Sequence, residues 1–183
     1  KWACPDVPSF DKVIVAGGNE LGLLLAKAME KTSLKAVVLE EDPERASYCA
    51  GELDRSLVLK GNALEQEALQ SAGVGPGTAF AAVTENDENN LIICMLAEKE
   101  GARFTLAQVR NPAYAPVIGS LSLLDRAVSP YHAMISAILH YVHGRNVRHA
   151  AVFHDLPGEL MDVTLSESMP WNGKAVMEIA LPK

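Results

Sequence analysis

The stretch that decides the fold is residues 13–22, with the sequence VIVAGGNELG. A short run of branched apolar residues leads into a glycine-containing turn, and the helical pattern ELGLLLAKAMEK overlaps and follows the turn. A strand, a glycine turn and a helix in this order are typical of the phosphate-binding turn of nucleotide-binding α/β proteins. The usual G-x-G-x-x-G spacing is broken, however, because Asn19 stands where the second glycine belongs.

Five more apolar runs, each followed by a helical or turn segment, continue the same alternation along the chain. The six expected strands are KVIVAG, KAVVLE, SLVLKG, TAFAAVT, RFTLAQVR and DRAVSP. Regular alternation of strands and helices indicates a parallel sheet with helices on both faces, and continuously apolar strands are typical of such a sheet. Because crossovers are right-handed, residues 10–145 are predicted to form a doubly wound, six-stranded Rossmann domain of the α/β class.

The sequence changes in character after Gly144. The segment NVRHAAVFHDLPGELMDVTLSES predicts two strands joined by a turn at Pro157–Gly158. Only about 40 residues remain, which is close to the lower limit for independent folding. We therefore interpret residues 146–183 as a linker and the beginning of a small, truncated β-rich module.

Composition narrows the possible functions. The 183 residues carry a net charge of −7, which argues against nucleic-acid binding, and no apolar run reaches the roughly 18 residues of a membrane span. Cys4, Cys49 and Cys94 are too widely spaced for a zinc knuckle or a disulfide framework, so reduced, partly buried thiols in a cytosolic protein are expected. The first residue is Lys1 rather than Met, which leads us to expect a fragment of a longer chain.

The glycine turn is predicted to bind phosphate. Gly17 and Gly22 take the roles of the first and third glycines, and Asn19 is expected to tolerate a positive φ while adding bulk where phosphate should lie. The helix that follows offers unpaired amides and a positive dipole end to an anion. The residues of the turn and of the helix start that are included in the predicted cofactor site are Gly17, Gly18, Asn19, Glu20, Leu21 and Gly22.

Glu40 ends the second expected strand, 18 residues beyond Gly22, where a carboxylate is able to bind both ribose hydroxyls. A carboxylate there repels a 2′-phosphate, so NAD or an adenosine nucleotide is favoured over NADP. Glu41 follows it and is included in the predicted site. The alternative is that Glu40 only begins a solvated acidic loop.

Polar residues also follow the third and fifth expected strands, whose carboxyl ends open onto the same crevice. Asn62, with Ala63 beside it, is placed to hydrogen-bond adenine. Arg110 is placed to pair with a phosphate, or alternatively with Glu88.

After the fourth expected strand, Thr84 could line the crevice or serve only the local structure. The string that follows it predicts a helix start with Asn86 as the N-cap and with Asp87 and Glu88 in the first turn.

Catalytic and metal sites are not predicted. His140 and His143 lie one helical turn apart, but a zinc site needs three or four ligands and no third is in view. The helix at 130–143 carries a broad apolar stripe, which either covers the sheet or forms a dimer contact with Tyr131 and Tyr141. The stripe consists of Met134, Ile135, Ile138, Leu139 and Val142.

The order of these motifs resembles the nucleotide-binding RCK (also called KTN, or TrkA-N) domains of TrkA-type regulators of potassium transport. The resemblance covers residues 10–145 and is carried by AAVTENDENNL and QVRNPAY more than by the glycine turn. WNGKAVMEIALP, near the end, resembles the start of the TrkA-C module that follows such domains.

The resemblance implies a non-enzymatic, cytoplasmic regulatory subunit, peripheral to the inner face of the membrane through a potassium-conducting partner. It implies binding of NAD or NADH, or alternatively ATP, ADP or AMP, and assembly into homodimers or higher rings through the helix at 130–143. On this basis Gly17, Gly18, Asn19 and Gly22 would contact phosphates, Glu40 ribose and Asn62 adenine, with Thr84 and Arg110 in the same crevice. This sequence departs from the family pattern at Asn19 and at Asn62, where the family carries glycine and an acid, and either change would alter or weaken binding.

Three hypotheses remain open from the sequence. The first is a ligand-sensing regulatory domain for potassium transport. The second is a truncated NAD-dependent oxidoreductase, and the third is a structural Rossmann domain that has lost its ligand through Asn19.

Overall fold

The computed structural model describes residues 9–114, 125–142, 147–152, 159–163 and 171–179. The chain divides into two compact units, Lys1–Pro130 and Tyr131–Lys183. The first unit therefore ends earlier than residue 145, where the sequence analysis places the domain boundary, and that boundary stays a prediction.

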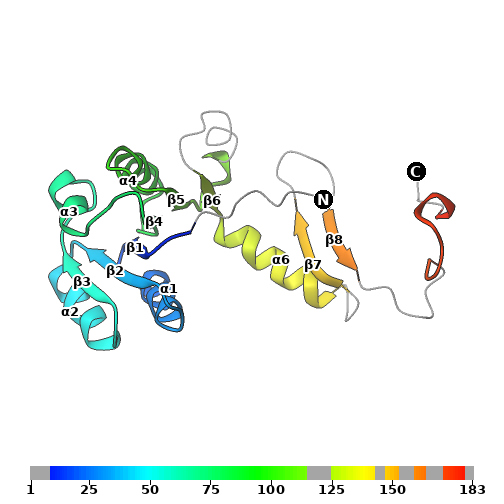
Figure 1. Ribbon diagram of the computed structural model, residues 1–183, viewed down its shortest axis with the longest axis horizontal. Helices are drawn as coiled ribbons and strands as arrows, with labels where there is room; N and C mark the ends of the chain where they lie inside the picture. Colours follow the sequence, from blue (N-terminus) through cyan, green and yellow to red (C-terminus); the bar gives the residue numbers. More distant parts are fainter. Residues whose placement is uncertain (1–8, 115–124, 143–146, 153–158, 164–170, 180–183) are drawn as a thin grey trace. The chain divides into compact units, whose positions relative to one another are not determined.

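A six-stranded sheet forms the centre of the first unit (Figure 1), and all its paired strands run parallel. The strand order is β3-β2-β1-β4-β5-β6. The strands are β1 (Lys12–Ala16), β2 (Lys35–Glu40), β3 (Leu57–Lys60), β4 (Thr78–Ala82), β5 (Phe104–Gln108) and β6 (Arg126–Val128). The helices are α1 (Glu20–Glu30), α2 (Pro43–Glu52), α3 (Gln66–Ser71) and α4 (Asp87–Lys99), with a 3-10 turn, η1, at Pro112–Tyr114. The predicted doubly wound, six-stranded parallel fold is confirmed.

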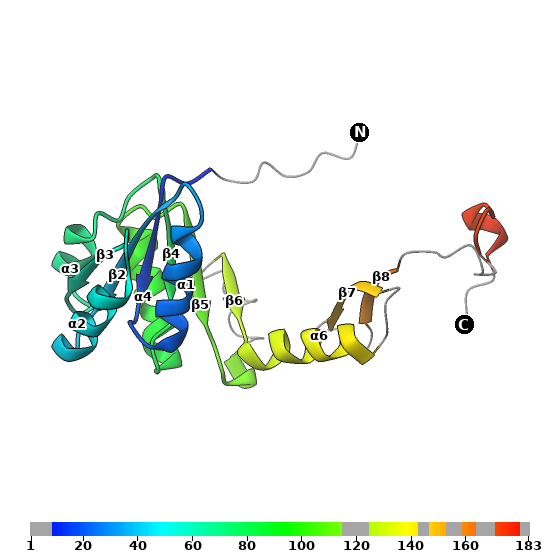
Figure 2. The same cartoon turned by 90° about the horizontal axis from the view of Figure 1, so that it is seen from below.

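Alternate residues of β1 pack against different helices, as a sheet covered on both faces requires. Ile14 lies in one apolar cluster with Leu69 of α3 and Ile93 of α4. Val15, the next residue along the strand, lies in another cluster with Leu25 of α1. Helices α3 and α4 thus cover one face of the sheet, and α1 covers the other (Figure 2).

Two helices begin at side-chain caps, and the cap at Asn86 is the one predicted from the sequence. The Asp42 side chain accepts a hydrogen bond from the Arg45 amide at 2.7 Å, and Pro43 is the first residue of α2. The Asn86 side chain accepts one from the Asn89 amide, also at 2.7 Å. These caps fix where α2 and α4 start, and therefore the length of the connections that follow β2 and β4.

Cys49 and Cys94 are free and buried, in agreement with the predicted thiols, and Cys4 lies outside the described residues. Burial raises the pKa of the Cys94 thiol to about 12, and it also raises the pKa of Cys49. Both side chains therefore stay protonated at neutral pH.

The second unit contains most of α6 (Pro130–Val142) and an antiparallel pair of strands, β7 (Val147–Val152) and β8 (Glu159–Val163). The two strands agree with the expected hairpin, whose turn at Pro157–Gly158 lies outside the described residues. A short 3-10 turn, η2 (Val176–Glu178), follows. Its assignment to a TrkA-C module stays a prediction. Among the described residues, no helix is both long enough and apolar enough to cross a membrane.

Candidate functional site

A pocket of about 330 Å³ opens at the carboxyl ends of the first four strands. The strand order reverses between β1 and β4, and parallel sheets bind ligands at such a reversal. Seven of the residues predicted from the sequence line this pocket: Gly17, Asn19, Glu40, Glu41, Asn62, Ala63 and Thr84.

The turn between β1 and α1 depends on two glycines. Gly17 has a φ of 109°, which side-chain-bearing residues rarely adopt. A Cβ on Gly22 would lie 1.9 Å from the carbonyl oxygen of Gly17. Glycine at both positions therefore lets α1 begin directly against the end of β1.

Asn19 is the N-cap of α1, with φ −66° and ψ 179°. Its Oδ1 accepts a hydrogen bond from the Gly22 amide at 3.0 Å, and its Nδ2 donates to the Val83 carbonyl at 2.6 Å. The tolerance of asparagine for a positive φ, expected from the sequence, is not needed here, because a capping residue has an extended backbone that lets its side chain reach the first turn. The two hydrogen bonds hold the side chain between α1 and the end of β4.

The first turn of α1 keeps two amides for a ligand. The amides of Glu20 and Leu21 have no intrahelical partner by helix geometry, and no acceptor is found for them among the described residues. Glu20 and Leu21 do not line the pocket, but they follow Asn19, which does. Two unpaired amides at the positive end of a helix dipole favour an anion.

Glu40 is the most constrained acid of the pocket, with only 6% of its surface exposed. One carboxylate oxygen accepts a hydrogen bond from the Gly18 amide, and the other accepts one from the Asp42 amide at 2.9 Å. Gly18 therefore lies behind the pocket lining, in contact with this carboxylate and with Cys49. Because each carboxylate oxygen has two lone pairs, both can still accept a hydrogen bond from a ligand hydroxyl.

Asn62 presents a donor rather than an acceptor to the pocket. Its Oδ1 accepts a hydrogen bond from the Leu64 amide at 2.9 Å, which closes a local turn after β3. The Nδ2 group has no hydrogen-bond partner among the described residues, which leaves a donor for a ligand. Leu39, Leu64 and Ile93 add apolar lining to the same pocket.

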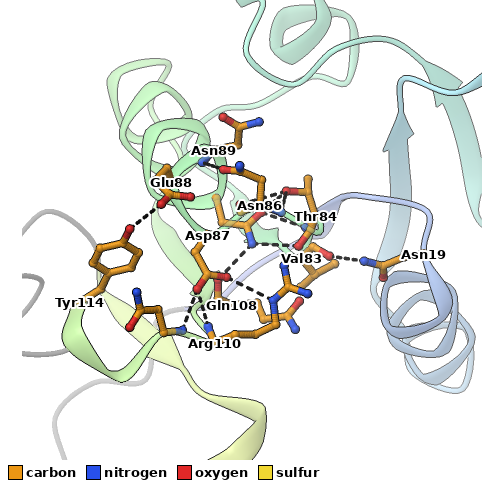
Figure 3. A network of polar contacts seen from close by, with 12 residues as sticks. Asn19, Val83, Thr84, Asn86, Asp87, Glu88, Asn89, Gln108, Arg110 and Tyr114 are labelled. Atoms are coloured by element: carbon orange, nitrogen blue, oxygen red, sulfur yellow. Dashed lines mark hydrogen bonds and ion pairs between the residues drawn. The ribbon is translucent and has the colours of Figure 1, made fainter.

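Thr84 is held by Asn90, a fully buried residue of α4. Asn90 Oδ1 accepts hydrogen bonds from the Thr84 amide at 2.9 Å and from its hydroxyl at 2.6 Å. Asn90 Nδ2 donates to the carbonyl oxygens of Thr84 at 3.1 Å and Gln108 at 3.0 Å. One side chain therefore ties the ends of β4 and β5 together, and Figure 3 shows Thr84, Gln108 and Asn19 within this network.

Arg110 is not brought into the pocket. Its Nε lies 3.4 Å from Asp87 Oδ1, and the amides of Arg110 and Asn111 both donate to Asp87 Oδ2 at 2.8 Å (Figure 3). Arg110 is thus paired with Asp87 and not with Glu88. The Glu88 carboxylate instead accepts a hydrogen bond from the hydroxyl of Tyr114. That hydrogen bond lowers the pKa of Glu88 and raises the pKa of Tyr114.

Three charged residues of the pocket, Asp42, Arg45 and Glu85, were not predicted as site residues. Asp42 caps α2, Arg45 lies in its first turn, and Glu85 follows Thr84, so each lies in the connection after a strand or at the start of the next helix. That proximity to a strand end is the signal that could have identified them. The other lining residues outside the predicted set are Leu39, Gly61, Leu64, Asn86, Asn89 and Ile93.

Metal ligation was not predicted, and within the described ranges no three His, Cys, Asp or Glu side chains gather in a way that could hold an ion. The side chains of His140 and His143 lie outside what the structure describes.

The fold and the glycine turn define the first unit as a Rossmann-like α/β domain with a turn of the nucleotide-binding type. The profile of the TrkA-N domain family matches residues 13–130, and the chain belongs to this family.

Sequence relatives agree with this membership. The chain is 33% identical over 174 residues to the Trk system potassium uptake protein TrkA of Azorhizobium caulinodans. The alignment covers 94% of this chain and 38% of that protein, so the chain spans well under half of the relative's length.

Solved structures share the fold. The TrkA-N domain of the inner membrane protein ybaL from Escherichia coli has a TM-score of 0.62 at 16% identity, covering 74% of this chain and 99% of that chain. A GsuK channel bound to NAD has a TM-score of 0.59 at 16% identity, covering 75% of this chain and 24% of that chain. At this level of identity, the likeness concerns the fold alone.

Proposed function

We propose that the first unit binds an adenine nucleotide, NAD or NADH or alternatively ATP, ADP or AMP, and that binding regulates potassium transport without turnover. The observation that carries this proposal is that Glu40 and Asn62 line one pocket together with Asn19, which is followed by the unpaired amides of Glu20 and Leu21. A carboxylate for ribose, a donor for a base and amides for phosphate match the parts of an adenosine phosphate. The family and the names of the relatives support the transport role.

The pocket is suited in size to an adenosine phosphate. Its volume of about 330 Å³ is near the lower end of ligand sites, which span roughly 300–1,000 Å³. It therefore fits a mononucleotide or the adenosine half of a dinucleotide. In this proposal the base lies against Ala63 and Leu64, the ribose binds Glu40, and the phosphate reaches the first turn of α1.

The conformation of Asn19 supports a site that retains its ligand. The side chain lines the pocket and is fixed by hydrogen bonds to Gly22 and Val83. It takes the Gly22 amide and leaves those of Glu20 and Leu21 to a ligand, which favours the regulatory hypothesis over that of a domain that has lost its ligand.

Regulation would follow from assembly of several copies. The side chains of Tyr131, Met134, Ile135 and Ile138 on α6 are exposed, and their spacing places them on one face of the helix. We propose that this face joins two copies of the chain, as predicted from the sequence, within a cytoplasmic ring bound to a potassium-conducting membrane protein. A nucleotide would then shift the ring between states to which it binds with different affinity.

Isothermal titration calorimetry of the chain with NAD, NADH, ATP, ADP and AMP tests the binding proposal. The chain is expected to bind at least one of these ligands, and Glu40→Ala should weaken that binding by about tenfold or more. Glu44→Ala, on the exposed side of α2, is the matched control and should bind as the parent does. No binding of any of the five at millimolar concentration, or turnover of the nicotinamide ring, would contradict the proposal.

A further inference from the structure

Two oppositely charged side chains face each other in the pocket. Arg45 comes from the first turn of α2, and Glu85 comes from the connection between β4 and α4. Arg45 Nη1 lies 3.4 Å from Glu85 Oε1, and both residues line the pocket. The pair therefore links the β2 side of the pocket to the β4 side.

Arg45 is the cation that the pocket lining provides among the described residues, against four carboxylates: Glu40, Glu41, Asp42 and Glu85. Two of these carboxylates already accept hydrogen bonds from backbone amides, Glu40 from Gly18 and Asp42 from Arg45 at the start of α2. Glu85 differs from them, because its hydrogen bond in the described structure is the one to Arg45. A ligand phosphate would compete with Glu85 for the same guanidinium.

The ion pair is easy to replace. The Arg45 and Glu85 side chains are 44% and 71% exposed, and exposed ion pairs contribute little to stability. A phosphate offers a guanidinium two parallel hydrogen bonds with a doubly charged group, which is a stronger contact. The exchange of partners therefore favours a ligand that carries a phosphate.

We propose that Arg45 is the specificity-determining residue for phosphate in this pocket, and that Glu85 holds its guanidinium until a ligand phosphate replaces the carboxylate. This inference rests on the proposed nucleotide-binding function and adds a residue to it. It requires opposite effects from two neutralising substitutions. Removing the Arg45 charge should weaken the binding of phosphate-bearing ligands, whereas removing the Glu85 charge should strengthen it.

The test is calorimetry on the full chain with AMP and adenosine, which differ only in the phosphate. Arg45→Gln is expected to weaken AMP binding about tenfold, and Glu85→Gln is expected to strengthen it about threefold. The affinity for adenosine should change by less than about twofold in both variants. The ion pair of Lys27 with Glu52, at 2.6 Å and away from the pocket lining, supplies the charge-matched controls Lys27→Gln and Glu52→Gln. Both controls should leave the two affinities at the parent values.

Each remaining outcome overturns the inference. Equal losses for AMP and adenosine in Arg45→Gln would make Arg45 a contact of the nucleoside, and weaker AMP binding in Glu85→Gln would make Glu85 a ligand contact. If Lys27→Gln weakens AMP binding as much as Arg45→Gln does, the effect comes from the net charge of the protein and not from a contact of Arg45. If the parent chain binds neither probe nor any of the other nucleotides, the proposed function fails and this inference fails with it. If the parent binds and the variants match it, only the inference fails.

Discussion

At the scale of single residues, Asn19 explains how the glycine turn tolerates a larger side chain. An extended backbone with φ −66° suits any residue, so the substitution costs no backbone strain. Within the turn, the left-handed conformation is that of Gly17, and the closest approach of the chain is at Gly22. The turn therefore depends on the first and third glycines and not on the second.

Gly22→Ala should destabilise the first unit by about 3 kcal/mol, because the new methyl group would overlap the Gly17 carbonyl and force α1 away from β1. Gly51→Ala, near the end of α2, is the control. No atom lies within 4 Å of a Cβ there, so the change should stabilise the protein by about 0.5–1 kcal/mol. Urea unfolding monitored by circular dichroism measures both, and effects of the same sign would refute the steric argument.

The candidate site was predictable where a motif fixes spacing along the chain. Glu40 follows from the strand–turn–helix pattern, since one short connection and one helix separate it from Gly17. Arg45 and Glu85 are 40 residues apart, and only the pairing of β1 with both β2 and β4 brings them together. The orientation of Asn62 was equally hidden, because it depends on a hydrogen bond to the Leu64 amide.

At the scale of elements, Glu30 anchors the end of α1 to the segment before β3. Glu30 Oε1 accepts a hydrogen bond from the Arg55 amide at 2.7 Å. It accepts two more from the amide and the hydroxyl of Ser56, each at 2.8 Å. These hydrogen bonds, led by the one from Arg55, lower the pKa of Glu30 from its ordinary value of 4.5 to about 2. The carboxylate therefore stabilises the fold fully above pH 4.5, and this contribution is lost as the pH falls through about 2.

Glu30→Gln should lower the unfolding free energy at neutral pH and should flatten its decline between pH 4.5 and about 2. Urea unfolding of the parent and the variant across this pH range measures the difference. Glu98→Gln on α4 is the control, since no side-chain hydrogen bond of Glu98 is found among the described residues. A parent and a Glu30 variant with parallel pH profiles would show that the anchor is not ionic.

The strands and most helices were predictable because burial dictates their pattern. The continuously apolar runs are typical of the strands of a covered sheet, and Asn86 marked the start of α4 correctly. The role of Asp87 was only partly visible from the sequence. First-turn capping was expected, but the side chain binds the amides of Arg110 and Asn111 after β5, a long-range contact with no local signal.

At the scale of the whole molecule, the first unit holds everything that the pocket needs. Its lining residues fall between Gly17 and Ile93, and the six strands end at Val128. A chain ending at Pro130 should unfold in a single cooperative transition and bind AMP within about twofold of the full chain, because separate units act independently.

A chain ending at Arg103 is the control for this truncation. It lacks β5 and β6, so Asn90 loses the Gln108 carbonyl and Asp87 loses its partners after β5. Circular dichroism and urea unfolding should show no cooperative transition for it. If the chain ending at Pro130 behaves in the same way, the first unit depends on the residues that follow it.

The anchoring of Asn90 to the Gln108 carbonyl also bears on synthesis, because the two residues are 18 positions apart. When the residues up to Ile93 have emerged from the ribosome, the nascent chain contains every residue of the pocket. The hydrogen bond from Asn90, which holds Thr84, to the Gln108 carbonyl has not yet formed. This hydrogen bond forms only when β5 has emerged and paired with β4. A metabolite that binds the finished pocket would then stabilise the folded form only of chains that have passed this point.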